Sequence, residues 1–166
     1  MLVWRIYDHR AAYTLKSGFD PLDGQGAALY PGRWNRLGVR LLYTSESPVL
    51  AMLELLTKLP PSTFGVRLAT EIALPNNFIL EDAGPGLLAK LYQAEPNDTQ
   101  ASGSVWAEET RSLVLRVPSA VLPINYNYLV NPLHPQAKEV RIVRQIEVSL
   151  DPRLKRHIRG QIKNRQ

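Results

Sequence analysis

The chain has 166 residues, of which 45% are hydrophobic, enough to build the core of one compact domain. It has no cysteine, which excludes disulfides, thiolate nucleophiles and cysteine-ligated zinc. Residues 151–166 carry six of the 20 Lys and Arg but one of the 15 Asp and Glu, so residues 1–150 are neutral and the net charge of +5 lies in the tail. A basic tail on a neutral body gives little support to a nucleic-acid-binding domain.

The start of the chain meets charges at Arg5, Asp8 and Arg10 before a secretory apolar segment could form. No apolar run is long enough to span a bilayer. We therefore expect a cytoplasmic protein with no membrane partner. We place one domain at residues 1–152 and a basic C-terminal tail at residues 153–166. The tail is interpreted as a solvated terminus, with binding to nucleic acid or another acidic partner as the alternative.

The first predicted strand is residues 2–7, where aromatic and branched side chains alternate with polar ones. Residues 8–32 show no sustained period and predict a long loop, with room for one short helix at residues 10–16. Long loops inside compact domains are often functional, and this one leads directly into a strand. Alternation places that strand at residues 39–45.

A helix is expected at residues 48–59, because Ser47 is a good N-cap and Pro48 suits the first helical position. Leucine and other apolar residues cover most of its surface and leave only a narrow polar seam. Glu54 lies on this seam, four residues before Lys58. This spacing fits an ordinary surface ion pair as well as it fits an acid directed into a site.

The remaining elements do not alternate regularly between strand and helix. This pattern favours the α+β class: a single domain with a mainly antiparallel or mixed sheet and a few helices. We expect strands at residues 65–74, 77–80, 112–118, 126–131 and 140–150, a helix at 86–94, a polar loop at 95–103 and a helical turn at 104–110.

Several familiar sites can be set aside. Residues 24–29 begin like a dinucleotide fingerprint, but they lack its third glycine and lead toward a strand instead of opening a helix. No phosphate-binding P-loop occurs, and the three histidines lack the spacing of metal ligands. We expect no metal and no bound prosthetic group.

Four side chains are candidates for a ligand site. Arg33 follows Gly32 and suits a phosphate, although a loop-anchoring ion pair is an equal local interpretation. Tyr43 could offer its ring to a ligand or lie in the core. Ser119 could contact a ligand or begin a turn. Trp34 is by its residue type more often a packing residue than a ligand platform.

Five sequence blocks combine these residues in one order. They are GRWN at 32–35, LYTS at 42–45, LE at 53–54, VPSA at 117–120 and NPLHP at 131–135. Together they resemble the RES-domain family, in a match that covers about residues 3–150. The family is named after an Arg, a Glu and a Ser, which correspond to Arg33, Glu54 and Ser119, with Ser112 or Ser102 as alternatives for the serine.

The resemblance implies the ADP-ribosyltransferase fold and a toxin of a bacterial toxin–antitoxin pair that consumes NAD+ as substrate. The implied partner is an Xre-type helix-turn-helix antitoxin, and a homodimer within the complex is left open. Mono-ADP-ribosyl transfer to a protein is the alternative within enzymes. An alternative outside the enzymes is a module that binds nucleic acid through the basic tail. We favour the enzyme and expect no direct binding to nucleic acid.

The resemblance also implies roles for single residues. Arg33 would hold the pyrophosphate, Tyr43 would confine the nicotinamide, and Glu54 would stabilise the cation that forms on the ribose. Ser119 would bind the ligand or position Glu54. These four are the predicted catalytic residues; the predicted substrate-binding residues are Gly32, Trp34, Asn35, Asn131 and His134.

Overall fold

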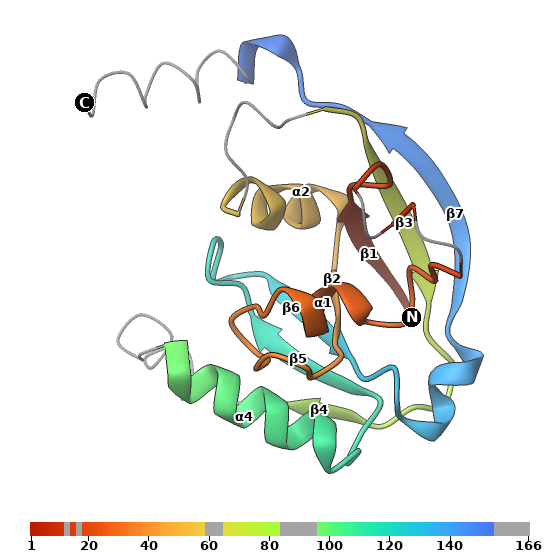
Figure 1. The fold of residues 1–166 in the computed structure, drawn as a ribbon, viewed down its shortest axis with the longest axis vertical. Coiled ribbons are helices and arrows are strands. Elements are labelled where there is room, and N and C mark those ends of the chain that lie inside the picture. Colours follow the sequence, from red (N-terminus) through yellow and green to blue (C-terminus); the bar gives the residue numbers. More distant parts are fainter. Residues whose placement is uncertain (12–13, 16–17, 59–64, 84–95, 155–166) are drawn as a thin grey trace.

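A computed structural model describes residues 1–11, 14–15, 18–58, 65–83 and 96–154. Within them, seven strands form one mixed sheet in the order β4-β5-β6-β2-β1-β3-β7 (Figure 1). Only the pair β4–β5 is parallel. The expected α+β class is thereby confirmed. The strands are β1 (Leu2–Tyr7), β2 (Leu42–Ser45), β3 (Arg67–Ala73), β4 (Leu80–Asp82), β5 (Val114–Pro118), β6 (Tyr126–Val130) and β7 (Arg141–Val148).

The sheet divides between β1 and β2. These two strands share one register pair, Trp4 opposite Ser45, whereas β1 pairs with β3 along all six of its residues. The β1–β3–β7 half therefore diverges from the β2–β6–β5–β4 half (Figure 1). The backbones of β1 and β2 therefore separate beyond this one pair.

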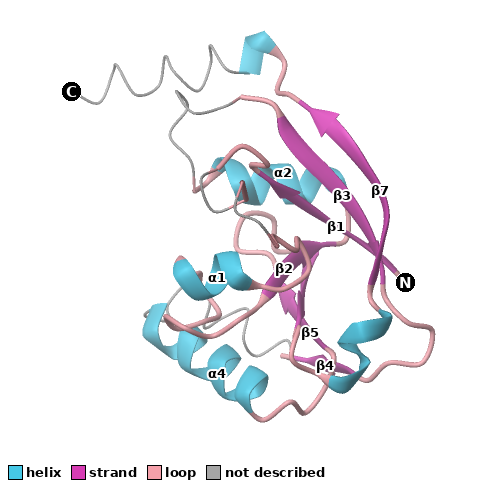
Figure 2. Ribbon diagram, turned by 45° about the vertical axis from the view of Figure 1, so that its right-hand side comes forward, coloured by secondary structure: helices cyan, strands magenta, loops and turns pink. Residues whose placement is uncertain are grey.

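Alternation along the strands creates a core on each face of the sheet. On one face, Leu115, Val117 and Leu129 pack with Trp106 of helix α4 (Pro96–Glu108). On the other face the cluster comprises Val3, Leu42, Ile72, Leu74, Leu113, Val114, Val130 and Val140. Figure 2 shows α4 lying along the β4–β5 end of the sheet. Two packed cores thus hold β2 and β6 rigidly between them.

Helix α2 (Pro48–Leu56) begins as predicted: the Ser47 hydroxyl accepts the Leu50 N–H at 3.2 Å, and Pro48 is its first residue. The helix ends at Leu56, before the predicted end at residue 59, which lies outside the described residues. Its inner side carries both apolar residues and the polar seam. Leu50 and Ala51 are buried while Val49 is 69% exposed, so the polar seam turns toward the sheet.

Other expectations differ from the structure at segments with little apolar periodicity. Helix α4 replaces the polar loop expected at residues 95–103 and absorbs the helical turn expected after it. A short helix, α1 (Gln25–Leu29), lies within the long loop. Strand β4 overlaps the predicted strand at residues 77–80 only at Leu80, and β2 begins three residues later than predicted. The helix predicted at residues 86–94 lies outside the described residues, and the one at 10–16 lies partly outside them.

None of the helices in the described ranges is long and apolar enough to cross a membrane.

Candidate active site

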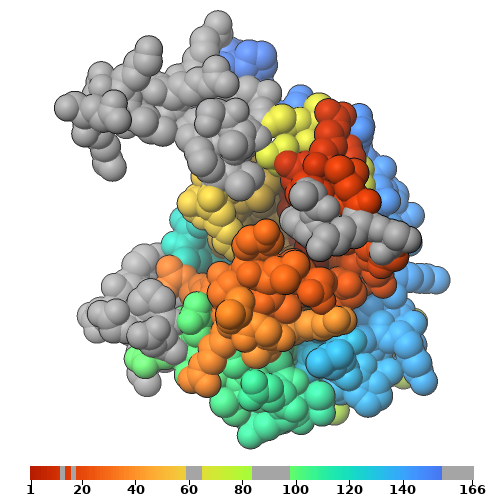
Figure 3. Space-filling view, in the orientation of Figure 1, coloured from red at the N-terminus to blue at the C-terminus, as the bar shows by residue number. Residues whose placement is uncertain are grey.

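The opening between the two halves of the sheet is a cleft of about 1100 Å³. Its walls come from β1, the segment 26–34, β2, the inner side of α2 and the start of β6. In the space-filling view, the segment 24–35 (orange) lies directly below α2 (gold) on one face of the molecule (Figure 3). Segments far apart in the sequence therefore meet at one site, which is at the large end of the range for ligand pockets.

Glu54 is fixed inside this cleft by two side chains. Its Oε1 accepts hydrogen bonds from the Ser119 hydroxyl at 2.7 Å and from the Asn127 amide at 2.6 Å. The described residues give no hydrogen bond to Oε2. Two charge-assisted bonds hold the carboxylate in one orientation and leave its second oxygen for a ligand.

Both partners of Glu54 are themselves held in place. The Ser119 oxygen accepts the N–H groups of Val121 and Leu122, at 3.1 and 3.0 Å, so its hydroxyl proton is free to point at the carboxylate. The Asn127 carbonyl oxygen accepts from the Ser45 hydroxyl at 2.6 Å, which turns its NH2 group toward Glu54. The orientation of the carboxylate is therefore set by groups on β2, on β6 and at the end of β5, all in one half of the sheet.

The choice among the three serines can be made on geometry. Ser102 is exposed on α4, and the buried Ser112 accepts a hydrogen bond from the Trp106 indole at 2.8 Å. Of the three, Ser119 is the one that touches Glu54. Glu54 forms no ion pair within 4.0 Å with Lys58 in the described structure, so the surface-pair interpretation of Glu54 does not apply.

Tyr43 combines a structural hydroxyl with a ring that faces the cleft. The hydroxyl donates to Asn35 Oδ1 at 2.8 Å and accepts the Trp34 N–H at 3.0 Å. Burial raises the pKa of Tyr43 well above its ordinary value, so the phenol stays protonated and keeps donating. Gly32 packs against this hydroxyl, since a Cβ there would lie only 2.6 Å from the Tyr43 oxygen.

Asn35, predicted to bind substrate, shapes the loop instead, whereas Trp34 packs in a core and also borders the cleft. Asn35 is fully buried, and its amide donates to the carbonyls of Ala27 and Val39 at 2.8 and 3.0 Å. Trp34 is 4% exposed and belongs to the core cluster of α4, although its edge lines the cleft. The expected ligand contact of Asn35 is therefore corrected to a loop-closing role.

One polar face of α4 holds the loop at residues 32–36 by hydrogen bonds to its backbone; we call this contact the α4 clamp. Thr99 donates to the Arg33 carbonyl at 2.7 Å, Gln100 donates to the Gly32 carbonyl at 2.8 Å, and Ser104 accepts the Arg36 N–H at 2.9 Å. These positions are spaced i, i+1 and i+5, so they share one side of a helix. The helical spacing of these polar residues was the sequence signal that could have predicted α4. A search for periodic apolar residues does not detect it.

Positive charge prevails among the described residues that line the cleft: Arg5, Arg33, Lys58 and Arg67, against Asp8 and Glu54. Arg67 pairs with Asp8 at 3.3 Å, and Arg5 donates to the Pro21 carbonyl at 2.7 Å. Arginine forks in a partly enclosed cleft suit phosphate oxygens. The cleft thus combines a cationic wall with a single oriented carboxylate.

Lys58 extends this cationic wall over the aromatic ring. Although the residue is exposed, its Nζ lies 4.9 Å from the Tyr43 ring centroid, inside the cleft. Desolvation lowers the pKa of Lys58, and the charges of Arg5 and Arg33 lower it further. The Glu54 carboxylate raises the pKa and offsets part of this shift.

The lowered pKa of Lys58 predicts a pH-dependent effect of Lys58→Met on thermal stability. The unfolded chain binds this proton more tightly than the folded protein, so the charged side chain destabilises the fold below its folded-state pKa. We expect Lys58→Met to have a higher Tm than the parent at pH 7. The gap should narrow as the pH rises toward the ordinary lysine value of 10.5. Lys138→Met, outside the cleft, is the control, and a gap that widens with pH would contradict the prediction.

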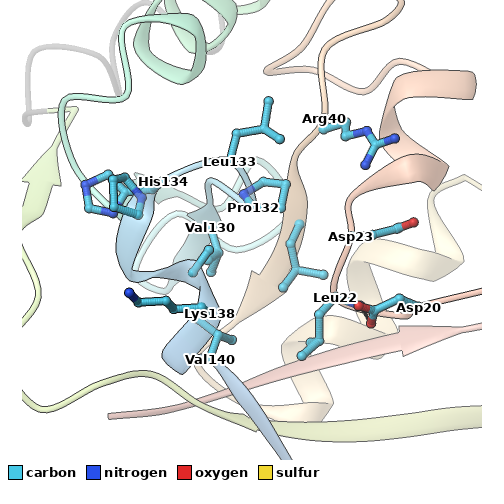
Figure 4. Close-up of a pocket in the computed structure, with 13 residues that line it drawn as sticks. Asp20, Leu22, Asp23, Arg40, Val130, Pro132, Leu133, His134, Lys138 and Val140 are labelled. Carbon is cyan, nitrogen blue, oxygen red and sulfur yellow. Dashed lines mark hydrogen bonds between the residues drawn. The ribbon is translucent and has the colours of Figure 1, made fainter.

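Asn131 and His134 do not join the cleft, which corrects their predicted role. Asn131 is fully buried and donates to the Ala107 carbonyl at 2.8 Å. His134 lines a separate cavity of about 460 Å³, next to Val130 and Pro132, as Figure 4 shows. Its Nδ1 accepts the Gln136 N–H at 3.2 Å and caps the 3₁₀ helix η2 (Pro135–Glu139). Val130 faces this cavity while Leu129 faces the cleft, so the two sites lie on opposite faces of β6.

Asn127 lies in the candidate site, bonded to Glu54, and was not among the residues predicted from the sequence. It lies on β6, opposite Ser45 of β2 in the strand register. That pairing brings the Asn127 amide to Glu54, and a single sequence does not reveal which strands are neighbours. The sequence feature closest to Asn127 was Ser45, at the end of the LYTS block, whose hydroxyl donates to the Asn127 carbonyl oxygen.

Comparison with known proteins identifies the family of the chain. The family model of the RES domain matches residues 2–151. The chain belongs to the RES-domain family. It is similar to the Prs ADP-ribosylating toxin of Sphingobium sp. (strain YBL2), with 35% identity over 91% of this chain and 94% of the relative. It is also similar to Toxin Res of Pseudomonas putida, with 34% identity over 86% of this chain and 92% of the relative.

A solved structure shows the same fold. The crystal structure of the M. tuberculosis MbcT–MbcA toxin–antitoxin complex contains a chain that matches with a TM-score of 0.69. The match covers 96% of this RES-domain chain and 88% of the other, at 16% identity. At that identity the likeness concerns the backbone architecture.

Proposed function

We propose that this RES-domain protein is the toxin of a toxin–antitoxin pair and that it cleaves the bond between nicotinamide and ribose in NAD+. The observation that carries the proposal is the Glu54 carboxylate, oriented by Ser119 and Asn127 within a cleft whose other charges are mainly positive. Relatives that carry the word toxin in their names support the cellular role.

The chemistry of NAD+ explains why one fixed carboxylate is useful. When the C1′–N bond breaks, its electron pair stays on the nicotinamide nitrogen, and the neutral base departs. Positive charge then moves onto C1′ and the ring oxygen of the ribose, as in glycoside hydrolysis. A carboxylate beside C1′ interacts more strongly with this transition state than with the ground state. Since the leaving group departs neutral, the site needs no strong general acid.

The other walls of the cleft would hold the rest of the dinucleotide. Arg33, exposed on its loop and facing the cleft, would bind the pyrophosphate, with Arg5 adding positive charge beside it. The Tyr43 ring would receive the nicotinamide. The α4 clamp fixes the backbone that carries Arg33, so the phosphate contact would be preorganised relative to Glu54.

The acceptor of the ADP-ribosyl group separates two variants of this function. Addition of water to C1′, with loss of a proton, gives ADP-ribose and makes the protein a glycohydrolase; addition of phosphate makes it a phosphorylase. A relative 35% identical to the chain is named a Prs ADP-ribosylating toxin, which favours transfer to a protein as the second candidate. Product analysis separates them: ADP-ribose, ADP-ribose-1″-phosphate or labelled protein.

The proposal is tested by mixing the purified protein with NAD+ and measuring free nicotinamide by ¹H NMR. We expect release by the parent protein and a loss of at least about tenfold in Arg33→Ala, since it removes a charged hydrogen-bonding partner of the pyrophosphate. Arg36→Ala is the matched control, because Arg36 is exposed on the same loop but does not line the cleft. Absence of release, with or without phosphate and cell lysate as acceptors, would refute the proposal.

We further propose an antitoxin of the Xre helix-turn-helix type as partner, acting on the domain at residues 1–152. The matched structure is a toxin–antitoxin complex, which supports an antitoxin as partner. Adding the product of a neighbouring reading frame should abolish nicotinamide release. Release that continues at saturating partner would contradict inhibition at this site.

A further inference from the structure

Lys58 makes a contact with Tyr43 that the proposed function leaves unexplained. It follows α2, with its backbone N–H donating to the Leu55 carbonyl at 3.1 Å, and its ammonium lies over the Tyr43 ring. Glu54, one turn earlier, is engaged by Ser119 and Asn127. The aromatic ring is therefore the contact that the structure gives to the Lys58 ammonium, and this contact belongs to the cation–π class.

The position of this ammonium conflicts with an occupied site. The nicotinamide ring of NAD+ carries a positive charge, and under the proposed function it lies on the face of Tyr43 that borders the cleft. Two cations cannot share that face, because they would overlap and repel each other in a partly desolvated space. Desolvation lowers the pKa of Lys58 and the charges of Arg5 and Arg33 lower it further, so the attraction of the Glu54 carboxylate and the contact with the ring hold the ammonium there against these forces.

We propose that Lys58 occupies the nicotinamide subsite of the free protein and that NAD+ binds by displacing its ammonium from the face of Tyr43. This inference rests on the proposed function. Lys58 is then a specificity-determining residue: it competes with the cationic ring of the intact substrate and has no such competition with ADP-ribose, which lacks the ring. Once nicotinamide becomes neutral by cleavage, it loses its charge-based attraction to the ring, and Lys58 can return.

The test compares two ligands and four proteins by calorimetric titration. Carba-NAD+, whose ribose oxygen is replaced by carbon, keeps the cationic ring without being cleaved, and ADP-ribose provides the adenosine, the phosphates and the second ribose without that ring. Phosphate attraction by Lys58 cancels in the ratio of their Kd values, carba-NAD+ over ADP-ribose. We expect Lys58→Met to lower this ratio about 2- to 30-fold, the range that a cation–π contact spans. Lys58→Arg, which retains a cation, and Lys138→Met, outside the cleft, should keep the parent ratio.

The outcomes distinguish the role of Lys58 from the proposed function itself. An unchanged or raised ratio in Lys58→Met, with both ligands binding the parent, overturns the role of Lys58 and leaves the proposed function standing. Failure of both ligands to bind the parent overturns the proposed function and this inference with it.

A second measurement reports the displacement directly. The ε-methylene protons of Lys58 should show an upfield ring-current shift in the NMR spectrum of the free protein. The shift should disappear on saturation with carba-NAD+ and persist with ADP-ribose. An upfield signal that survives saturation with carba-NAD+ overturns the inference, because the ammonium would then have stayed on the ring.

Discussion

Replacing Glu54 by Gln is expected to slow nicotinamide release from NAD+ by at least about 100-fold, the scale on which enzymes lose rate when an electrostatic partner of the transition state is removed. The amide has the shape of the carboxylate, and its oxygen can still accept from Ser119 and Asn127, as Glu54 Oε1 does. The negative charge beside C1′ is what disappears. Initial rates with saturating NAD+ measure the effect on kcat, where a loss of transition-state stabilisation appears.

Two comparisons make the Glu54 result specific. Glu108→Gln removes a carboxylate from the exposed end of α4 and should leave the rate unchanged. The Kd of ADP-ribose should change little in Glu54→Gln, because the cationic wall is intact. A Glu54→Gln protein that retains a third or more of the parent rate would contradict the role assigned to this carboxylate.

Replacing Gly103 by Ala is expected to destabilise the fold by about 1–3 kcal/mol, as overpacking does. A Cβ on Gly103 would overlap the Trp34 carbonyl oxygen and lie 3.0 Å from the Trp34 carbonyl carbon. These are backbone atoms, so no side-chain rotation relieves the contact. The helix must move away from the loop, which strains the bonds of Thr99 to Arg33 and of Ser104 to Arg36. The KM for NAD+ should therefore rise as well, because Arg33 loses its fixed position.

The sign of the Gly103 effect is diagnostic. In an ordinary helix interior, Gly→Ala stabilises by up to about 1 kcal/mol, so destabilisation requires the close approach of α4 to the loop. Urea unfolding measures the difference, with Ser102→Ala as the neighbouring exposed control, expected within about 0.5 kcal/mol of the parent. A stabilised Gly103→Ala protein would show that α4 does not clamp the loop.

Strands and one helix were predictable because their signals are local. β1 shows the period of two that a sheet imposes, and Ser47–Pro48 carries the chemistry of a helix start. Helix α4 was not predictable in this way, because the side of it that meets the segment 32–36 is polar. Thr99, Gln100 and Ser104 serve backbone groups of a distant loop, and a search for apolar periodicity reads such a segment as a loop.

The candidate site was predictable in part. Motif order brought Arg33, Tyr43 and Glu54 into one hypothesis, and the structure places all three in one cleft, with Ser119 bonded to Glu54. Their catalytic roles stay predictions.

Asn131 and His134 were misassigned because the family block after β6 leaves the cleft: Asn131 is buried against the Ala107 carbonyl, and His134 lines the far cavity. Asn127 was missed because its place beside Glu54 depends on the pairing of β6 with β2. Register and face depend on strand pairing, which a single sequence does not specify.

A crystal structure with carba-NAD+ shows whether this cleft presents the scissile bond of NAD+ to Glu54. We predict the nicotinamide ring on Tyr43, C1′ beside Oε2 of Glu54, the pyrophosphate at Arg33, and Lys58 moved off the ring. A dinucleotide bound in the His134 cavity, or bound in the cleft with its adenine end at Glu54, would contradict it.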